Sequence, residues 1–164
     1  SGVPGVGWVV LIGDEKFKTL MIQGENSLSR LKEEFAPYDT ALLDDWIRVS
    51  ESHIDFSSPG YMASVGEEIK SFDPDCIILD PWNHIITGDK LDNYTKAIKE
   101  IETLRKFGSK ERLILIVAHN RKPNTDNKHS GRDLLPEISG SHKLGSYASA
   151  VFVMESMNED NDNS

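Results

Sequence analysis

Two carboxylates and a histidine stand at or just after the ends of three apolar runs. Asp80 closes the run CIILD, while Glu25 follows TLMIQ and His119 follows LILIVA. One carboxylate at a strand end can hold the water shell of Mg²⁺, and a second can orient and deprotonate an attacking water. A polar side chain on a further strand can sense a terminal phosphate. Taken singly, each residue also fits a helix cap, a solvated turn or a surface histidine, but the set indicates hydrolysis of a nucleoside triphosphate.

The apolar runs predict the strands that must position these residues. Three runs show little alternation, which is typical of parallel strands covered on both faces. They are residues 19–23, 76–80 and 113–118. A fourth run, AVFVM at residues 150–154, predicts another strand, and residues 9–12 form a weaker candidate.

Helical patterns alternate with these runs. Three segments combine apolar residues at helical spacing with recognisable ends: residues 28–35 after a Ser27 cap, residues 62–72 before Asp73 and Pro74, and residues 91–104 between an Asp89 cap and Gly108. Strands that alternate with helices predict an α/β fold with a parallel sheet and right-handed crossovers. Ligands bind at the carboxyl ends of such strands, where the three polar residues are expected to lie.

A glycine-rich segment near the start of the sequence resembles half of a phosphate-binding loop. The residues GVPGVG at positions 2–7 match G-x-x-x-x-G, whose backbone N–H groups cradle phosphates. The candidate nucleotide-binding residues are Gly2, Pro4, Gly5 and Gly7. The next two positions should hold Lys and Ser or Thr, but they hold Trp8 and Val9. A flexible, low-complexity leader is the alternative interpretation.

Length, charge and cysteine content narrow the class of protein. The 164 residues correspond to one domain, and 38% hydrophobic residues are enough for a packed core. A net charge of −9 argues against a generally basic nucleic-acid-binding surface, although a local basic loop is compatible with it. We expect no secretory signal and no membrane span. The single Cys76 fits a reducing compartment, so the expected location is cytoplasmic.

Over residues 18–154 the chain resembles the RecA-like ATPase domain of RepA-type replicative helicases and their KaiC-like relatives. The matching segments, in order, are TLMIQGENSLSRLKEEF, FDPDCIILDPW, LILIVAHNRKP and SGSHKLGSYASAVFVME. The resemblance implies a RecA-like P-loop NTPase fold with a mainly parallel sheet and helices on both faces. It also implies ATP and Mg²⁺ as ligands, a homo-oligomeric ring expected to be a hexamer, and single-stranded nucleic acid, DNA in preference, as partner.

The resemblance also implies a role for each residue that matches a family motif. Glu25 matches the glutamate that activates water, and Asp80 matches the Walker B aspartate that holds Mg²⁺ through water. His119 matches the histidine that reports the state of the γ-phosphate to the nucleic-acid loops. The loop facing the central channel would supply cations for nucleic-acid backbone contacts: Arg121, Lys122, Lys128 and Arg132.

The position of an arginine finger is not assigned by the resemblance. Relatives often carry Arg-Gly-Ser before the last strand, whereas this chain has Ser139 at the arginine position. Lys143 is the nearest cation and the candidate inter-subunit residue, although lysine lacks the planar fork of arginine.

Two departures from the family pattern concern the phosphate loop and the segment after it. Besides the missing Lys and hydroxyl, only residues 8–18 separate the loop from the next strand, and this length spans about 16 Å as a helix. We therefore expect a defect between Gly7 and Lys18, either a lost phosphate loop or an absent connecting segment. The expected organisation is a single RecA-like domain at 1–155, with 156–164 an acidic tail or truncated hairpin.

Two other functions are compatible with the same residues. One is a catalytically inactive RecA-like scaffold that keeps the fold for assembly. The other is a small-molecule α/β enzyme in which Asp80, His84 and His119 bind a metal.

Overall fold

The computed structural model of this chain describes residues 17–50, 54–85, 91–108, 110–119 and 147–154. The weak strand candidate at residues 9–12, the Asp89 cap and the acidic tail at 156–164 lie outside these ranges. No helix in the described part of the chain is both long and apolar enough to cross a membrane.

A four-stranded sheet forms the centre of the fold, and all of its strands are parallel. The strands are β1 (Thr19–Gln23), β2 (Ile47–Val49), β3 (Cys76–Asp80) and β4 (Leu113–Ile116), in the spatial order β2-β1-β3-β4. The predicted bounds of β1 and β3 are confirmed. β4 ends two residues earlier than predicted, and the three-residue β2 was not predicted.

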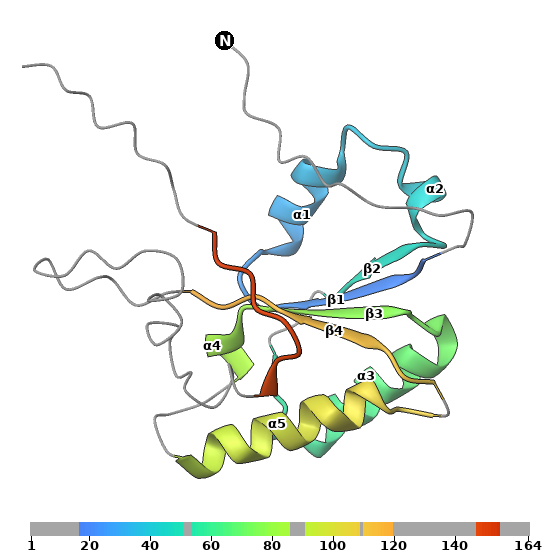
Figure 1. The fold of residues 1–164 in the computed structure, drawn as a ribbon. Coiled ribbons are helices and arrows are strands. Elements are labelled where there is room, and N and C mark those ends of the chain that lie inside the picture. The colour runs from blue at the N-terminus through green and yellow to red at the C-terminus, as the bar shows by residue number, and fades with distance from the viewer. Residues whose placement is uncertain (1–16, 51–53, 86–90, 109, 120–146, 155–164) are drawn as a thin grey trace, which may run out of the picture.

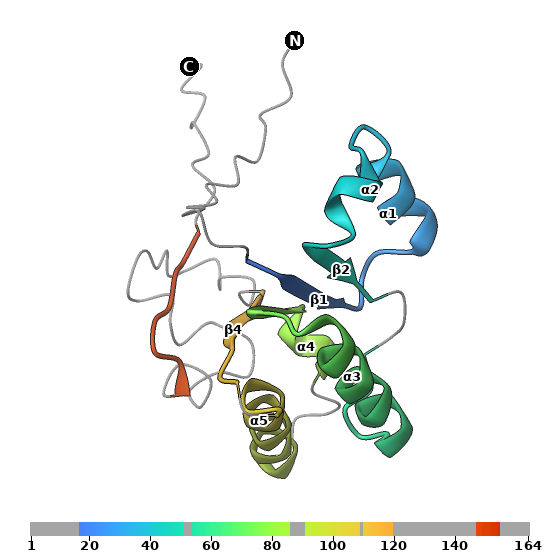
Figure 2. The ribbon, with the colours of Figure 1, turned by 90° about the vertical axis from the view of Figure 1, so that its right-hand side faces the viewer.

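Helices lie on both sides of the sheet, as Figures 1 and 2 show. On one side are α1 (Leu28–Phe35) and α2 (Thr40–Leu43); on the other are α3 (Pro59–Phe72), α4 (Trp82–Ile85) and α5 (Leu91–Arg105). The three longer helices were predicted, whereas the one-turn helices α2 and α4 were not. The α/β class with a parallel sheet is therefore confirmed.

The predicted helix ends are also found where the structure describes them. The Ser27 hydroxyl accepts a hydrogen bond from the Arg30 N–H at the start of α1. Asp73 ends α3 in the left-handed region at φ 50°, and its N–H donates to the Ile69 carbonyl. Gly108 adopts φ 73° shortly after α5, a conformation that glycine takes without steric cost.

The core lies between the sheet and helices α3 and α5. It is formed by inward-facing strand residues and one face of each helix, including Leu20, Ile22, Ile77, Leu79, Ile69, Phe72, Ile101 and Leu104. Trp82 also belongs to this core, with 1% of its surface exposed. A tryptophan buried to this degree does not offer its ring for stacking on a base.

Two expectations about the last two strands are wrong in the described residues. Residues 150–154 form no strand; Phe152 and Met154 are 87% and 93% exposed. β4 is not covered on both faces, since Leu113 and Leu115 are 59% and 42% exposed. β-branched and aromatic residues favour a strand only where a neighbour pairs with it, and no described strand pairs with residues 150–154.

A cluster of charged side chains lies at the amino ends of the strands, at the opposite end of the sheet from the predicted site. Asp75 accepts a hydrogen bond from the Lys18 N–H at 2.8 Å and pairs with the Lys110 ammonium at 2.6 Å. Partial burial of the Asp75 carboxyl opposes its ionisation, but the contacts with Lys110 and Lys18 outweigh this and lower its pKa.

The lowered pKa of Asp75 predicts a loss of stability in acid. A carboxyl with a lowered folded-state pKa stabilises the fold above its unfolded-state value of about 4, and this contribution is lost as the pH falls through the folded-state pKa. Asp75→Asn should therefore unfold at lower urea than wild type at neutral pH, with the gap closing as the pH falls through the folded-state pKa of Asp75. The matched change Glu33→Gln, at an exposed position of α1, should leave urea unfolding at neutral pH unchanged. A gap that persists in acid would contradict this role of Asp75.

Candidate functional site

The carboxyl ends of β1, β3 and β4 meet at one edge because these strands are adjacent and parallel. Gln23, the last residue of β1, is paired with Asp80, the last residue of β3. Beyond the strands, the Gly24 N–H donates to the Asp80 carbonyl at 2.9 Å, and the Val117 N–H donates to the Leu79 carbonyl at 2.9 Å. These bonds fix the three strand ends to one another.

This edge brings Glu25 and His119 into direct contact. The His119 Nε2 atom lies 3.3 Å from the Glu25 Oε1 atom, although the residues are 94 positions apart in the sequence. Their side chains are 60% and 45% exposed. A contact this exposed adds little to stability, so the fold does not depend on it. Both side chains remain accessible to a ligand.

Asp80 lies within electrostatic reach of the same residues. Burial raises the pKa of its carboxyl, and the negative charge of Glu25 raises it further, while His119 and His84 act in the opposite direction. Two carboxylates and two imidazoles therefore form one electrostatic cluster at the edge. A cation beside Asp80 would favour its ionised form, as expected for a carboxylate that binds Mg²⁺ through water.

The turn that carries Glu25 is held by a buried glutamine. Gln23 is only 2% exposed, and its side-chain oxygen accepts from the Glu25 N–H at 3.1 Å and the Asn26 N–H at 2.7 Å. Its side-chain nitrogen donates to the carbonyls of Asn26 and Ser50, at 2.9 and 3.1 Å. Four hydrogen bonds satisfy this amide. Sequence reasoning missed Gln23; the available signal was a polar residue ending an apolar run.

Replacing Gln23 is expected to destabilise the turn and the fold. Gln23→Leu leaves the Glu25 and Asn26 N–H groups without their acceptor, which costs about 1–3 kcal/mol in urea unfolding. Gln23→Glu is a matched variant, because it keeps the oxygen that accepts from Glu25 and Asn26 but replaces the donating nitrogen with a second oxygen that faces two carbonyls. We expect it to be destabilising too, since it loses both donors. A free energy of unfolding within about 0.5 kcal/mol of wild type for Gln23→Leu, the usual range for a neutral surface change, would contradict this role.

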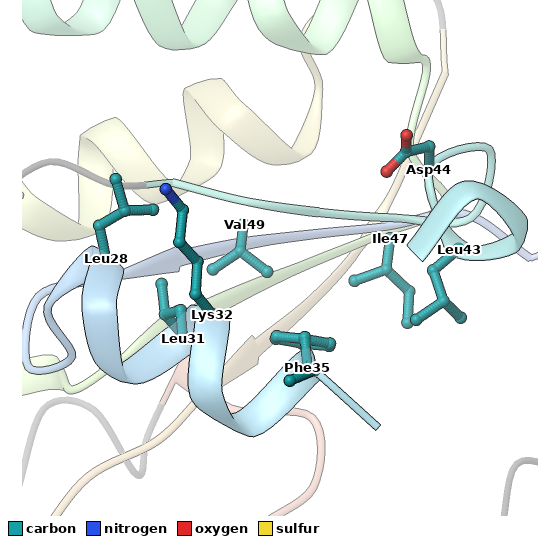
Figure 3. Close-up of a pocket in the computed structure, with 9 residues that line it drawn as sticks. Leu28, Leu31, Lys32, Phe35, Leu43, Asp44, Ile47 and Val49 are labelled. Atoms are coloured by element: carbon teal, nitrogen blue, oxygen red, sulfur yellow. The ribbon is translucent and has the colours of Figure 1, made fainter. Parts of the chain in front are cut away.

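Two hollows in the described chain lie elsewhere. Figure 3 shows the first, about 280 Å³, between α1, α2 and β2, with a mainly apolar lining that includes Leu28, Leu31, Phe35, Leu43, Ile47 and Val49. A second, about 730 Å³, lies along β2 and α3. Neither lining includes Glu25, Asp80 or His119. These three predicted site residues therefore lie at the open sheet edge and not in the two hollows.

The metal-enzyme alternative is not supported by the described side chains. Among the described residues, no three His, Cys, Asp or Glu side chains converge closely enough to hold a metal ion directly. Asp80, His84 and His119 thus do not form a three-ligand site in this arrangement. Mg²⁺ keeps several waters and needs only one or two carboxylates, so Asp80 remains suited to it.

The other predicted site residues lie outside the described ranges. They are the phosphate-loop residues Gly2, Pro4, Gly5 and Gly7, the basic-loop residues Arg121, Lys122, Lys128 and Arg132, and the inter-subunit candidate Lys143. The expected defect between Gly7 and Lys18 also falls almost entirely in this part of the chain.

Comparison with known proteins adds no family assignment. No protein-family model matches the chain, and no curated protein matches it. The function therefore has to be argued from the fold and the residues at the sheet edge.

Proposed function

We propose that this chain is a RecA-like domain that binds and hydrolyses ATP, as part of a ring-forming helicase or a DNA replication or recombination ATPase. The observation that carries the proposal is the contact between Glu25 and His119 at 3.3 Å, formed beside Asp80 at the carboxyl edge of a parallel sheet. Ligands of open parallel sheets bind at this edge.

Each residue has a distinct part in the proposed reaction. Asp80 would hold Mg²⁺ through water, and the ion would supply positive charge that offsets the negative charge of the phosphate oxygens. Glu25 orients the attacking water and accepts its proton. Its exposed carboxylate suits this role, because a water can reach it from the solvent side.

His119 is the proposed sensor of the terminal phosphate. Its imidazole contacts the Glu25 carboxylate. A γ-phosphate entering the site offers a second anion to the same imidazole, so the contact changes between the nucleotide states. His119 is separated from residues 121–132 by Asn120 alone, and this short connection would carry the change to the basic loop.

The proposed partners follow from that loop and from the family resemblance. Arg121, Lys122, Lys128 and Arg132 supply cations for the backbone of single-stranded nucleic acid, with DNA as the preferred form. Further copies of the chain would complete a ring, with Lys143 as the candidate residue that reaches a neighbouring subunit. A cytoplasmic location fits this function.

A second candidate function is the inactive RecA-like scaffold. The observation that favours it is the pair Trp8 and Val9 where a phosphate loop carries Lys and Ser or Thr. Tryptophan cannot neutralise the charge of the β- and γ-phosphates, and valine cannot bind Mg²⁺.

Phosphate release from ATP distinguishes the two functions. The ATPase proposal requires a native phosphate loop that carries the Lys and the hydroxyl missing at Trp8 and Val9. With that loop complete, it expects Mg²⁺-dependent hydrolysis, increased by single-stranded DNA and abolished by EDTA. Binding of ATP should be followed in parallel by equilibrium titration. A folded protein that neither binds nor hydrolyses ATP would overturn the ATPase proposal and favour the scaffold.

A further inference from the structure

His84 contacts the turn that carries Glu25 from a different segment of the chain. It lies in the one-turn helix α4 directly after β3, and its Nδ1 atom is 3.2 Å from the Gly24 carbonyl oxygen. A carbonyl oxygen can only accept a hydrogen bond, so the Nδ1 atom donates in this contact. The contact therefore selects the form of the ring that is protonated at Nδ1.

The fit between His84 and Gly24 is close enough to exclude a larger residue. A Cβ atom at position 24 would lie 2.7 Å from the His84 Nδ1 atom, which is shorter than real contacts of this kind. Any larger residue at position 24 would force the imidazole or the turn to shift.

Both backbone polar groups of Gly24 form hydrogen bonds. Its N–H donates to the Asp80 carbonyl at 2.9 Å, and its carbonyl accepts from His84. The next N–H, that of Glu25, is bound by the Gln23 side chain. The backbone of the turn is therefore fixed against the end of β3 immediately before the Glu25 side chain begins.

We propose that His84 is a positioning residue that locks the Gly24–Glu25 turn onto the end of β3, so that the carboxylates of Glu25 and Asp80 face one bound nucleotide. The proposal rests on the proposed function for its effect on turnover. His84 acts through the Gly24 carbonyl and not on the substrate.

Three substitutions of His84 separate hydrogen bonding from packing. His84→Ala removes the donor. His84→Asn restores an N–H at about the distance of Nδ1 from the backbone, whereas His84→Gln places its amide one carbon further out. We expect His84→Ala to lower kcat for ATP by about tenfold to hundredfold with little change in KM, because a small misplacement of a catalytic group is costly. His84→Asn should recover most of this loss and His84→Gln little of it.

A readout that does not need turnover is hydrogen exchange of the Gly24 N–H, followed by NMR. Exchange should be faster in His84→Ala and return toward wild type in His84→Asn. Exchange of the Asp73 N–H, which donates to the Ile69 carbonyl at the distant end of α3, is the internal control and should not change.

The steric contact gives a second test by a double-mutant cycle. Gly24→Ala should be destabilising in the wild-type background, because the new methyl group meets the imidazole. The same change should cost less in a His84→Ala background, where that contact is absent. Additive effects would overturn the direct contact.

The outcomes for His84 and for the proposed function are separate. Unchanged Gly24 exchange in His84→Ala would overturn the positioning role even in an active ATPase. Equal loss of kcat in His84→Ala and His84→Asn would also overturn it. Absence of hydrolysis by the wild-type chain would overturn the proposed function instead, and the exchange data and the cycle would then decide alone whether His84 holds the turn.

Discussion

Glu25→Gln is expected to stop ATP turnover while leaving nucleotide binding largely intact. The amide keeps the shape of the side chain and loses the basicity that the attacking water requires, and loss of a general base lowers rates by about 10²–10⁴-fold. Binding should not weaken, because removing the Glu25 charge also removes a repulsion from Asp80. Steady-state phosphate release and equilibrium titration with ATP measure the two quantities.

The matched control for Glu25→Gln is the same change at another exposed carboxylate, Glu33→Gln on α1. It should have no effect on either quantity. If Glu25→Gln hydrolyses ATP at the wild-type rate, Glu25 is not the general base and is removed from the mechanism.

Asp80→Asn is expected to weaken binding itself, and only when Mg²⁺ is present. The amide lacks the negative charge that holds the hydrated ion, so we expect the Kd for ATP with Mg²⁺ to rise about tenfold or more, equal to about 1.4 kcal/mol. In EDTA the variant and the wild type should bind ATP with the same affinity. The comparison isolates the ion from direct contacts between the side chain and the nucleotide.

Asp75→Asn provides the control for this effect, because it makes the same chemical change just before the start of β3. It lies at the amino edge, where its partners are Lys18 and Lys110. Asp75→Asn should leave the affinity for ATP unchanged at neutral pH. A Kd for Asp80→Asn equal to that of wild type would show that Asp80 does not hold the ion.

The main strands could be predicted because their signal is local. β1 and β3 each contain a continuous apolar stretch, at residues 20–22 and 76–79, and such stretches favour buried parallel strands. The short elements could not be predicted, because a local signal needs more residues than these elements contain. β2, α2 and α4 contain three or four residues each, which is too few to show a strand or helix period.

The placement of Glu25, Asp80 and His119 at one edge could also be predicted, because it follows from parallel strands whose carboxyl ends coincide. The residues that hold this edge together could not be predicted from the sequence. Gln23 and His84 act through contacts with backbone groups of other segments, including Ser50 and Gly24. No period or motif in the sequence reports such contacts.

The two errors about residues 113–118 and 150–154 share a physical cause. An apolar run shows that a segment favours burial, but it does not show which neighbour buries it. In the described chain Leu113 and Leu115 alternate with the better buried Ile114 and Ile116 along β4, although all four residues are apolar. A continuous apolar run therefore does not show that one face of an edge strand is more exposed than the other.

Paramagnetic broadening by ATP with Mn²⁺ in place of Mg²⁺ tests most directly whether the strand ends form one nucleotide site. The proposed site predicts that the amide NMR signals of Gly24, Asp80 and His119 broaden together. The Asp75 and Lys110 signals should broaden much less, because they lie at the other end of β3, about 16 Å away at 3.3 Å per residue, and the broadening falls steeply with distance. Sharp signals at the strand ends, or broadening confined to the hollow beside α1 and β2, would contradict a nucleotide site at this edge.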